Sequence, residues 1–257
     1  MSYGAFALFY DALTDNVCYH KRAEFINSQI KKYGAKQDGI LLDLACGTGS
    51  LSFEMEKLGF DVVGVDLSED MLSVAMEKKA ELNSSALFLR QDMRELDMFG
   101  TIDVCLCALD SLNHLSSLDD IKKVFDRVSL FLNQDALFIF DMNTIYKHRE
   151  ILSDKSFVYD LDEIFCVWQN SPCDRDNDNQ LEISLDFFIP DEDEEDVYFR
   201  ESESFFERAY EVSTIKGLLE ENGFELMAIY DGDSFSPFCE ASQRAMFVAR
   251  LKTFKNG

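Results

Sequence analysis

Apolar and polar positions follow two different patterns along this chain, and the change occurs near residue 150. Between residues 40 and 142, short apolar runs the length of a strand alternate with segments whose apolar side chains have helical spacing. This alternation predicts a parallel sheet with helices on both faces. The predicted strands are 40–44, 61–65, 86–90, 102–108 and 136–141, and the predicted helices lie near 50–58, 69–82 and 118–132.

From about residue 153 the pattern changes to strands alone. Turns rich in Asp, Asn and Pro join these segments, so consecutive strands should pair antiparallel. The acidic run at 191–196 is most simply a solvated hairpin tip rather than a metal site. We therefore expect an inserted antiparallel β layer at 153–208, within a main domain formed by residues 1–152 and 209–257. Its strands are predicted at 157–161, 164–169, 180–189 and 197–206.

The two ends of the chain are expected to complete the main domain. Residues 2–33 carry apolar side chains near helical spacing, which predicts one or two helices that end at Gly34. After the insertion, a helix over 214–221 should precede strands at 225–230 and 245–251. Serine hydroxyls accept hydrogen bonds from the free N–H groups at a helix start, so four residues are candidate caps: Ser50, Ser68, Ser117 and Ser213.

The most informative stretch is the first predicted strand and the turn that follows it. Only Asp43 interrupts its apolar run, as expected for a parallel strand covered on both faces. Gly47 and Gly49 allow positive φ and the close approach of a ligand to the backbone. The second strand is followed by Asp66, about 20 residues after the turn, where acids bind ribose hydroxyls in nucleotide-binding βαβ units. We therefore expect a ligand containing ribose at this edge of the sheet.

Two common ligands of such turns do not suit this one. A phosphate-binding loop needs Lys followed by Ser or Thr after its last glycine, but Gly49 is followed by Ser50 and Leu51. A dinucleotide fold needs a third glycine where this chain has Ser52, and Asp43 would repel a pyrophosphate. An oxidoreductase that binds a nicotinamide cofactor is therefore the weaker alternative.

The segment Asp43-Leu44-Ala45-Cys46-Gly47-Thr48-Gly49 resembles motif I of the class I S-adenosyl-L-methionine (SAM) methyltransferases. The resemblance extends over nearly the whole chain. It is greatest to bacterial small-molecule methyltransferases with an inserted antiparallel lid, in which segments like 168–170 and 207–210 recur. It implies an α/β fold with a doubly wound, Rossmann-like sheet of seven strands, and SAM as the cofactor.

The resemblance also implies which residues hold SAM. In this family the acid at Asp43 and the loop backbone hold the methionine part, and Asp66 binds the ribose. Asp92 would take the adenine amino group, and Met93 would lie near the ring. An aromatic N-terminal segment like residues 3–11 often closes over the cofactor. The candidate cofactor residues are Tyr10, Tyr19, Asp43, Ala45, Cys46, Gly47, Gly49, Asp66, Leu67, Met71, Asp92, Met93 and Leu109.

Methyl transfer needs a general base only when the attacking atom arrives with its proton. Polar side chains expected near the substrate are the candidates, because they follow the fourth and fifth strands or the insertion. They are Asp110, His114, Asp141 and Tyr210. No metal ligand set is expected, because the seven cysteines include no C-x-x-C pair.

The charge and composition of the chain disfavour some classes of binding partner. The net charge of −25 disfavours a nucleic acid substrate, since neutralised phosphates dominate the affinity of proteins for nucleic acids. It disfavours an anionic membrane surface for the same reason. No apolar run approaches the ~20 residues that span a bilayer, and the odd number of cysteines argues against a disulfide framework, so we expect a cytoplasmic protein.

Two functions remain in view. The first is a SAM-dependent methyltransferase that acts on a small-molecule acceptor. The second is a SAM-binding regulatory or interaction protein without catalysis. Turnover of SAM to S-adenosylhomocysteine in the presence of cell metabolites separates the two.

Overall fold

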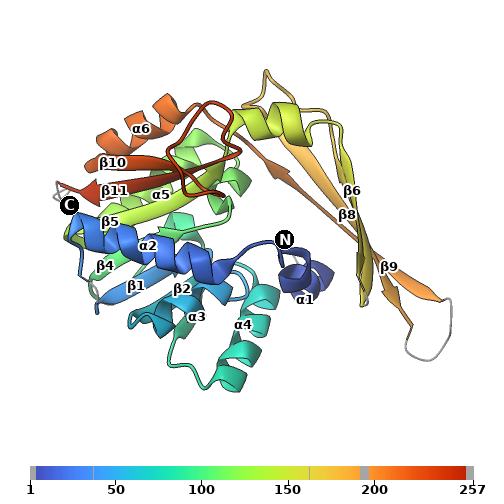
Figure 1. Ribbon diagram of the computed structural model, residues 1–257, viewed down its shortest axis with the longest axis horizontal. Coiled ribbons are helices and arrows are strands. Elements are labelled where there is room, and N and C mark those ends of the chain that lie inside the picture. Colours follow the sequence, from blue (N-terminus) through green and yellow to red (C-terminus); the bar gives the residue numbers. More distant parts are fainter. Residues whose placement is uncertain (1–3, 37, 162, 192–196, 253–257) are drawn as a thin grey trace.

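The structure is a computed structural model that describes residues 4–252 apart from residues 37, 162 and 192–196 (Figure 1). The first residue of the aromatic segment 3–11 and most of the acidic run at 191–196 therefore lie outside the described residues. No helix in the described ranges is long and apolar enough to cross a membrane.

Seven strands form the main sheet, in the order β10-β11-β5-β4-β1-β2-β3. Strands β1 to β5 run parallel, and β11 is antiparallel to both β5 and β10, as expected. The strand order reverses at β1 and β4, so their carboxyl ends flank the crevice where ligands bind in such sheets. The strands are β1 (Ile40–Leu44), β2 (Asp61–Asp66), β3 (Leu87–Arg90), β4 (Ile102–Cys107), β5 (Leu132–Asn143), β10 (Phe224–Asp231) and β11 (Arg244–Leu251).

Helices cover both faces of this sheet, because alternate strand residues face opposite sides (Figure 1). Leu42 of β1 belongs to the apolar core under α5 and α6, whereas its neighbour Leu41 belongs to the core under α2 and α3. The helices are α1 (Gly4–Leu13), α2 (Tyr19–Tyr33), α3 (Ser50–Lys57), α4 (Glu69–Leu82), α5 (Leu118–Phe131) and α6 (Val212–Glu221), with short helical turns η1 (Met93–Glu95), η2 (Ser111–His114) and η3 (Lys147–Leu152).

Two of the four predicted serine caps are confirmed. Ser68 and Ser117 each accept a hydrogen bond from the backbone three residues later, at 3.2 Å. The other two were wrong. Helix α3 is capped by the left-handed backbone of Gly49, and the first residue of the helix, Ser50, donates its hydroxyl to Asp11 instead. Helix α6 begins at Val212, so Ser213 already lies inside it.

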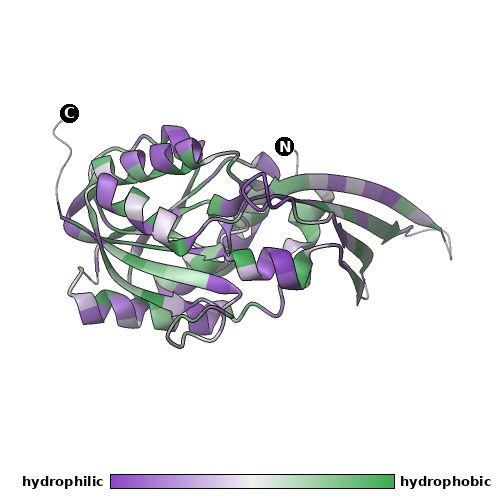
Figure 2. Cartoon of the chain, turned by 90° about the horizontal axis from the view of Figure 1, so that it is seen from above, coloured by the Kyte–Doolittle hydropathy of each residue, from purple (hydrophilic) through white to green (hydrophobic). Residues whose placement is uncertain are grey.

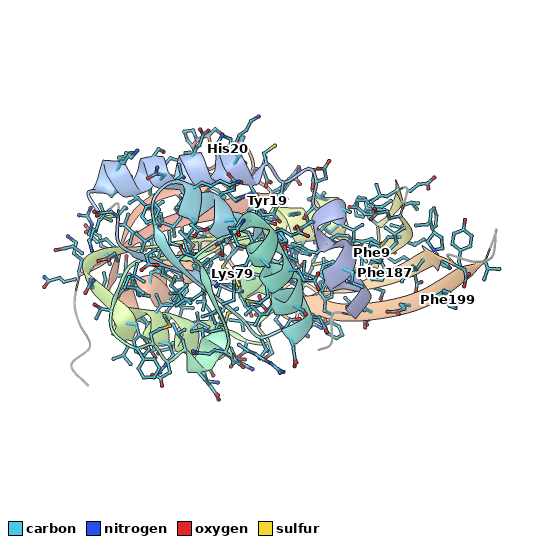
Figure 3. The ribbon with its side chains drawn as sticks, turned by 90° about the horizontal axis from the view of Figure 1, so that it is seen from below. Phe9, Tyr19, His20, Lys79, Phe187 and Phe199 are labelled. Atoms are coloured by element: carbon cyan, nitrogen blue, oxygen red, sulfur yellow. The ribbon has the colours of Figure 1, made fainter. Side chains whose placement is uncertain are left out.

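The insertion forms a separate antiparallel sheet in the order β6-β7-β8-β9, as predicted. Figure 1 shows this sheet, the lid, extending away from the main sheet, with α1 between the two. Apolar and polar residues alternate along its strands (Figure 2). Its buried face includes Phe187 and Phe205, against which Phe6 and Phe9 of α1 pack (Figure 3). The strands are β6 (Ser156–Leu161), β7 (Ile164–Asn170), β8 (Leu181–Pro190) and β9 (Tyr198–Glu207).

Strand β5 is longer than predicted at both ends. Asp141 was predicted as the last residue of this strand, and Asn143 lies beyond the predicted end. Both lie within the observed strand and pair with Met246 and Arg244 of β11. The antiparallel partner extends the ladder past the apolar run, because backbone pairing does not require an apolar side chain. Both side chains consequently occupy fixed positions at the carboxyl end of the sheet.

Candidate active site

The turn after β1 is shaped by three residues in the left-handed backbone region. Ala45, Gly47 and Gly49 have φ of +58°, +53° and +76°. A Cβ at Gly49 would lie 2.9 Å from the ring of Phe88, so this glycine is required for packing. A Cβ at Gly47 would meet nothing within 4 Å. The backbone at Gly47 is therefore open to a ligand.

Asp66 holds this turn to the next one. One carboxylate oxygen accepts a hydrogen bond from the amide of Gly47 at 2.8 Å, and the other accepts from the amide of Ser68 at 2.8 Å. Burial raises the pKa of Asp66, against the effect of these bonds. The acid thus joins the ends of β1 and β2 and lines the cavity between them.

Asp43 lies beneath the same turn and is almost fully buried, at 2% exposed. Its carboxylate accepts a hydrogen bond of 2.5 Å from the hydroxyl of Ser52. Burial raises the pKa of Asp43 to about 6, and the nearby charge of Asp66 adds to the shift. A bound cation would favour the ionised form of this carboxyl.

A cavity of about 350 Å³ opens at the carboxyl ends of β1, β2, β3 and β4. A smaller cavity of about 40 Å³ adjoins it and shares five lining residues with it. Among the candidate cofactor residues, the large cavity is lined by Tyr10, Ala45, Gly47, Asp66, Leu67, Met71, Asp92, Met93 and Leu109, and the small cavity adds Tyr19, Asp43 and Cys46. Gly49 lines neither cavity and acts through the packing of the turn.

Several residues that line the cavities were not predicted from the sequence, and Arg94 is the clearest example. Its guanidinium binds Asp92 through contacts of 2.5 to 3.1 Å, and these hydrogen bonds lower the pKa of Asp92. The position of Arg94, two residues after a candidate acid, was the available signal. The other residues of the large cavity that were not predicted are Phe6, Val65, Ser68, Gln91, Ser111, Leu115 and Ser116, and those of the small cavity alone are Thr48, Ser50, Leu51 and Ala108.

Helix α1 forms one wall of the cavity through Phe6 and Tyr10. A polar cluster fastens this helix to α4 and to the turn after β1. The ammonium of Lys78 lies 2.7 Å from Asp11 and 2.6 Å from the hydroxyl of Ser50. On the other side, the amide of Phe6 donates to Glu203 of the lid at 3.1 Å. Helix α1 therefore touches the cavity, the main domain and the lid.

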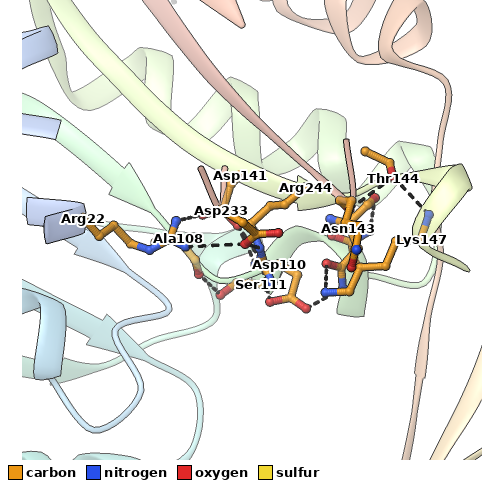
Figure 4. Close-up of polar contacts among 12 residues, drawn as sticks. Arg22, Ala108, Asp110, Ser111, Asp141, Asn143, Thr144, Lys147, Asp233 and Arg244 are labelled. Atoms are coloured by element: carbon orange, nitrogen blue, oxygen red, sulfur yellow. Dashed lines mark hydrogen bonds and ion pairs between the residues drawn. The ribbon is translucent and has the colours of Figure 1, made fainter. Parts of the chain in front are cut away.

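Two of the four candidate catalytic residues lie in an ion cluster that does not line the cavity (Figure 4). Arg244 contacts Asp110 at 2.9 Å and Asp141 at 2.7 Å, and Arg22 contacts the other oxygen of Asp141 at 2.9 Å. Burial would raise the pKa of Asp110, but the charges of Arg244 and Lys147 hold it below its usual range. Cations therefore occupy both carboxylates, and its lowered pKa makes Asp110 a weak base.

The other two candidates differ in their access to the cavity. His114 lines it, and its Nε2 lies 3.9 Å from Glu207 of β9. Tyr210 is buried in the core under α5 and α6, and its hydroxyl has no hydrogen-bond partner in the described part of the chain. Burial raises the pKa of Tyr210 to about 12. The structure therefore brings His114 alone of the four to the cavity.

Known proteins resemble this chain in both sequence and structure. A family model described as a methyltransferase domain matches residues 41–135. A protein of Geobacillus sp. strain WCH70 described as a methyltransferase is 33% identical over 250 residues, covering 97% of this chain and all of that protein. A Bacillus subtilis protein with the same description is 30% identical over 253 residues, covering 97% of each chain.

A solved structure gives the cofactor. An S-adenosylmethionine-dependent methyltransferase from Clostridium acetobutylicum superposes with a TM-score of 0.85 at 31% identity, covering 96% of this chain and 97% of that one. The agreement includes the main sheet and the inserted lid. The chain belongs to the SAM-dependent methyltransferases.

Proposed function

We propose that this methyltransferase acts on a small molecule whose reacting atom is an N–H or O–H group. The observation that carries the proposal is the position of Phe6. Its ring lines the cavity and also packs against Phe187 and Phe205 of the lid, with centroid distances of 6.4 and 6.0 Å. Helix α1 thus walls the cavity, and the lid packs against that helix, which limits the size of the acceptor.

The residues present fit SAM. The open backbone at Gly47 and the ionisable pair Asp43 and Asp66 suit a ligand that is cationic and contains ribose. We assign Asp66 to the ribose, Asp92 and Met93 to the adenine, and the turn after β1 to the methionine part. When bound, SAM supplies an electrophilic methyl group on a positively charged sulfur. The protein has to align that group with the acceptor and exclude water.

We assign the role of general base to His114. It is the candidate that reaches the cavity, and the ring lies against Phe205 of the lid at 5.0 Å between centroids. Asp110 and Asp141 are held by arginines, so we assign them to holding the carboxyl ends of β4 and β5 in place. Tyr210 is assigned to packing, since it does not line the cavity.

We further propose residues 153–208 as the lid and residues 1–152 with 209–257 as the SAM-binding domain. The sheet order supports this division, since β6 to β9 pair only with one another among the described strands. The net charge of −25 supports an acceptor other than nucleic acid. The seven unpaired cysteines support a cytosolic location.

The test is direct. The protein is incubated with methyl-labelled SAM and a filtered extract of cell metabolites, and labelled products are identified by mass spectrometry. A labelled small molecule together with S-adenosylhomocysteine is expected. Label that stays on SAM would favour the regulatory alternative, and label that appears only on protein or RNA added separately would contradict a small acceptor.

A further inference from the structure

The lid places a buried carboxylate next to His114, a residue that lines the cavity. Glu207 is the last residue of β9 and is 3% exposed. Its Oε1 lies 3.9 Å from Nε2 of His114, which lines the cavity from the main domain. This pair connects the candidate base with the insertion, and the sequence gives no local signal for it because the two residues are far apart in the chain.

Other contacts fix Glu207 in place. The amide group of Asn143 donates to its Oε2 at 2.9 Å, and Nε2 of His148 lies 3.3 Å from the same oxygen. His148 is fully buried and donates from Nδ1 to the carbonyl of Asn179 at 2.8 Å. Glu207 is therefore held between the end of β5 and the η3 turn.

The carboxylate is ionised in this position. Burial would raise the pKa of Glu207, but the contact with His148 and the charge of His114 outweigh that effect and leave it below its usual value. Four other titratable groups face the same pair: Asp66 at the end of β2, Asp110 before η2, and Lys147 and His148 in η3.

The two nitrogens of His114 are not equivalent. A carboxylate beside Nε2 favours the tautomer that carries its hydrogen there. Nδ1 is buried and has no hydrogen-bond partner among the residues that the structure describes. A buried polar atom without a partner is costly, which suggests that a ligand completes its bonding.

We propose that Glu207 is a positioning residue that selects the Nε2–H tautomer of His114 and stabilises the ring when it becomes charged. The inference rests on the proposed function, with His114 as the base. As the acceptor atom gains the methyl group, its bond to hydrogen breaks and the proton moves to Nδ1. The electrons of the broken carbon–sulfur bond remain on sulfur. The imidazolium then lies beside the carboxylate, so the lid takes part in the chemistry as well as covering it.

The first test is a nuclear magnetic resonance titration of the protein saturated with S-adenosylhomocysteine. The chain has only three histidines, and His114→Gln assigns the relevant signal. Glu207→Gln keeps an acceptor for Asn143 but removes the charge. It should lower the titration midpoint of His114 by about one pH unit, since an opposite charge nearby favours the charged form. The titration midpoint of His20, which is exposed, should not change in Glu207→Gln. The midpoint of His114 should not change in the control variant Glu201→Gln, which lies on the same strand as Glu207.

The second test uses the unmodified protein and does not depend on how the variant folds. Nitrogen chemical shifts should show that neutral His114 carries its hydrogen on Nε2. Hydrogen on Nδ1, or an unchanged midpoint in folded Glu207→Gln, would overturn the proposal. Neither measurement requires an acceptor, so both can succeed or fail independently of the metabolite labelling test.

A kinetic readout separates positioning from simple structural support. With the acceptor fraction found by labelling, Glu207→Gln should reduce the plateau of kcat about tenfold and move the acidic limb of the pH profile to lower pH. A loss of kcat at every pH with an unmoved limb would show a structural role instead. Binding of S-adenosylhomocysteine should stay within threefold, because Glu207 does not line the cavity.

Discussion

Lys78 of α4 forms an ion pair of 2.7 Å with Asp11 of α1, and this contact fastens the helix that walls the cofactor cavity. The same ammonium reaches Thr48 and Ser50 in the turn after β1. The cavity wall is thus fixed by a few polar contacts between side chains that are only partly buried. Partly exposed ion pairs contribute little to overall stability, so the contact should matter more for ligand exchange than for folding.

The first prediction concerns this contact. Lys78→Met should weaken the hold on α1, so S-adenosylhomocysteine should dissociate about three to ten times faster, a loss of roughly 1 kcal/mol. Stopped-flow measurement of dissociation checks this. The neighbouring Lys79→Met is the matched control, because Lys79 forms no ion pair with any described residue. Equal dissociation rates in the two variants would show that the contact between Lys78 and Asp11 does not hold the ligand in place.

The second prediction concerns Asp66, which we propose binds the ribose. Asp66→Asn should weaken the binding of S-adenosylhomocysteine by about 2–3 kcal/mol, as expected when a charge-assisted hydrogen bond is lost. Thermal stability without ligand should also fall slightly, because the carboxylate holds the amides of Gly47 and Ser68. Isothermal titration measures the affinity. Asp61→Asn, at the other end of β2, serves as control. If Asp66→Asn and Asp61→Asn bind S-adenosylhomocysteine with the same affinity, Asp66 does not contact the ligand.

The third prediction is a pH dependence that arises at Asp43. Its folded pKa of about 6 exceeds its ordinary value of 3.8, so the native protein binds a proton between these limits that the unfolded chain does not bind. The contribution of this group to stability is therefore favourable at low pH and decreases as the pH rises from about 4 to 6. A cationic ligand favours the charged form, so SAM affinity should decrease as the pH falls below 6.

Comparison with Asp43→Asn isolates this effect, because the other buried acids titrate alike in both proteins. The free energy of unfolding of the variant, relative to wild type, should increase between pH 4 and pH 7 by up to about 3 kcal/mol. Urea unfolding at several pH values measures the difference. If the difference in unfolding free energy between the variant and the wild type does not change with pH, Asp43 is not the source of the pH dependence.

The fourth prediction tests the ion cluster. Arg244→Gln would leave Asp141, which is fully buried, with one cation in place of two. Loss of one partner from a buried pair costs about 3–5 kcal/mol, so the melting temperature should fall sharply. Calorimetry checks this. Arg200→Gln, which breaks an exposed pair on the lid, should change stability by less than about 1 kcal/mol. Similar melting temperatures for both variants would contradict a structural role.

The fifth prediction concerns the lid. Replacement of residues 153–207 by a short Gly-Ser linker should abolish methylation of the native acceptor but retain SAM binding within about tenfold. The deletion uncovers Phe6 and Phe9, so the variant should also carry Phe6→Ser and Phe9→Ser to remain soluble. Methylation is followed with labelled SAM. Activity at the wild-type rate would show that the insertion serves another purpose.

The local pattern of apolar and polar residues was sufficient to predict most of the helices and strands. The strand at 40–44 and the helix at 69–82 were predicted with the observed limits, because each has clear periodicity and a turn or cap beside it. The serine caps were less predictable. Ser50 follows a left-handed glycine that already shapes the helix start, so its hydroxyl is available for Asp11.

Many residues that line the two cavities were predictable, whereas the ion cluster beside them was not. Residues such as Asp43 and Asp66 carry a spacing that the β1–β2 unit imposes. Arg22 and Arg244, in contrast, lie 119 and 103 residues from Asp141, and such distant pairs have no periodic signal. Glu207 was not among the predicted site residues for the same reason. Acids that were read as catalytic candidates from the sequence proved to be partners of cations far away in the chain.

The position of α1 has a consequence for the order of events in turnover. Phe6 and Tyr10 of this helix border the cavity, and Phe6 and Phe9 support the lid. Displacement of the helix to release the spent cofactor would therefore also withdraw support from the acceptor side. We expect steady-state kinetics of the ordered sequential type, in which the cofactor enters first and S-adenosylhomocysteine leaves last. Product inhibition by S-adenosylhomocysteine should accordingly be competitive with SAM and non-competitive with the acceptor.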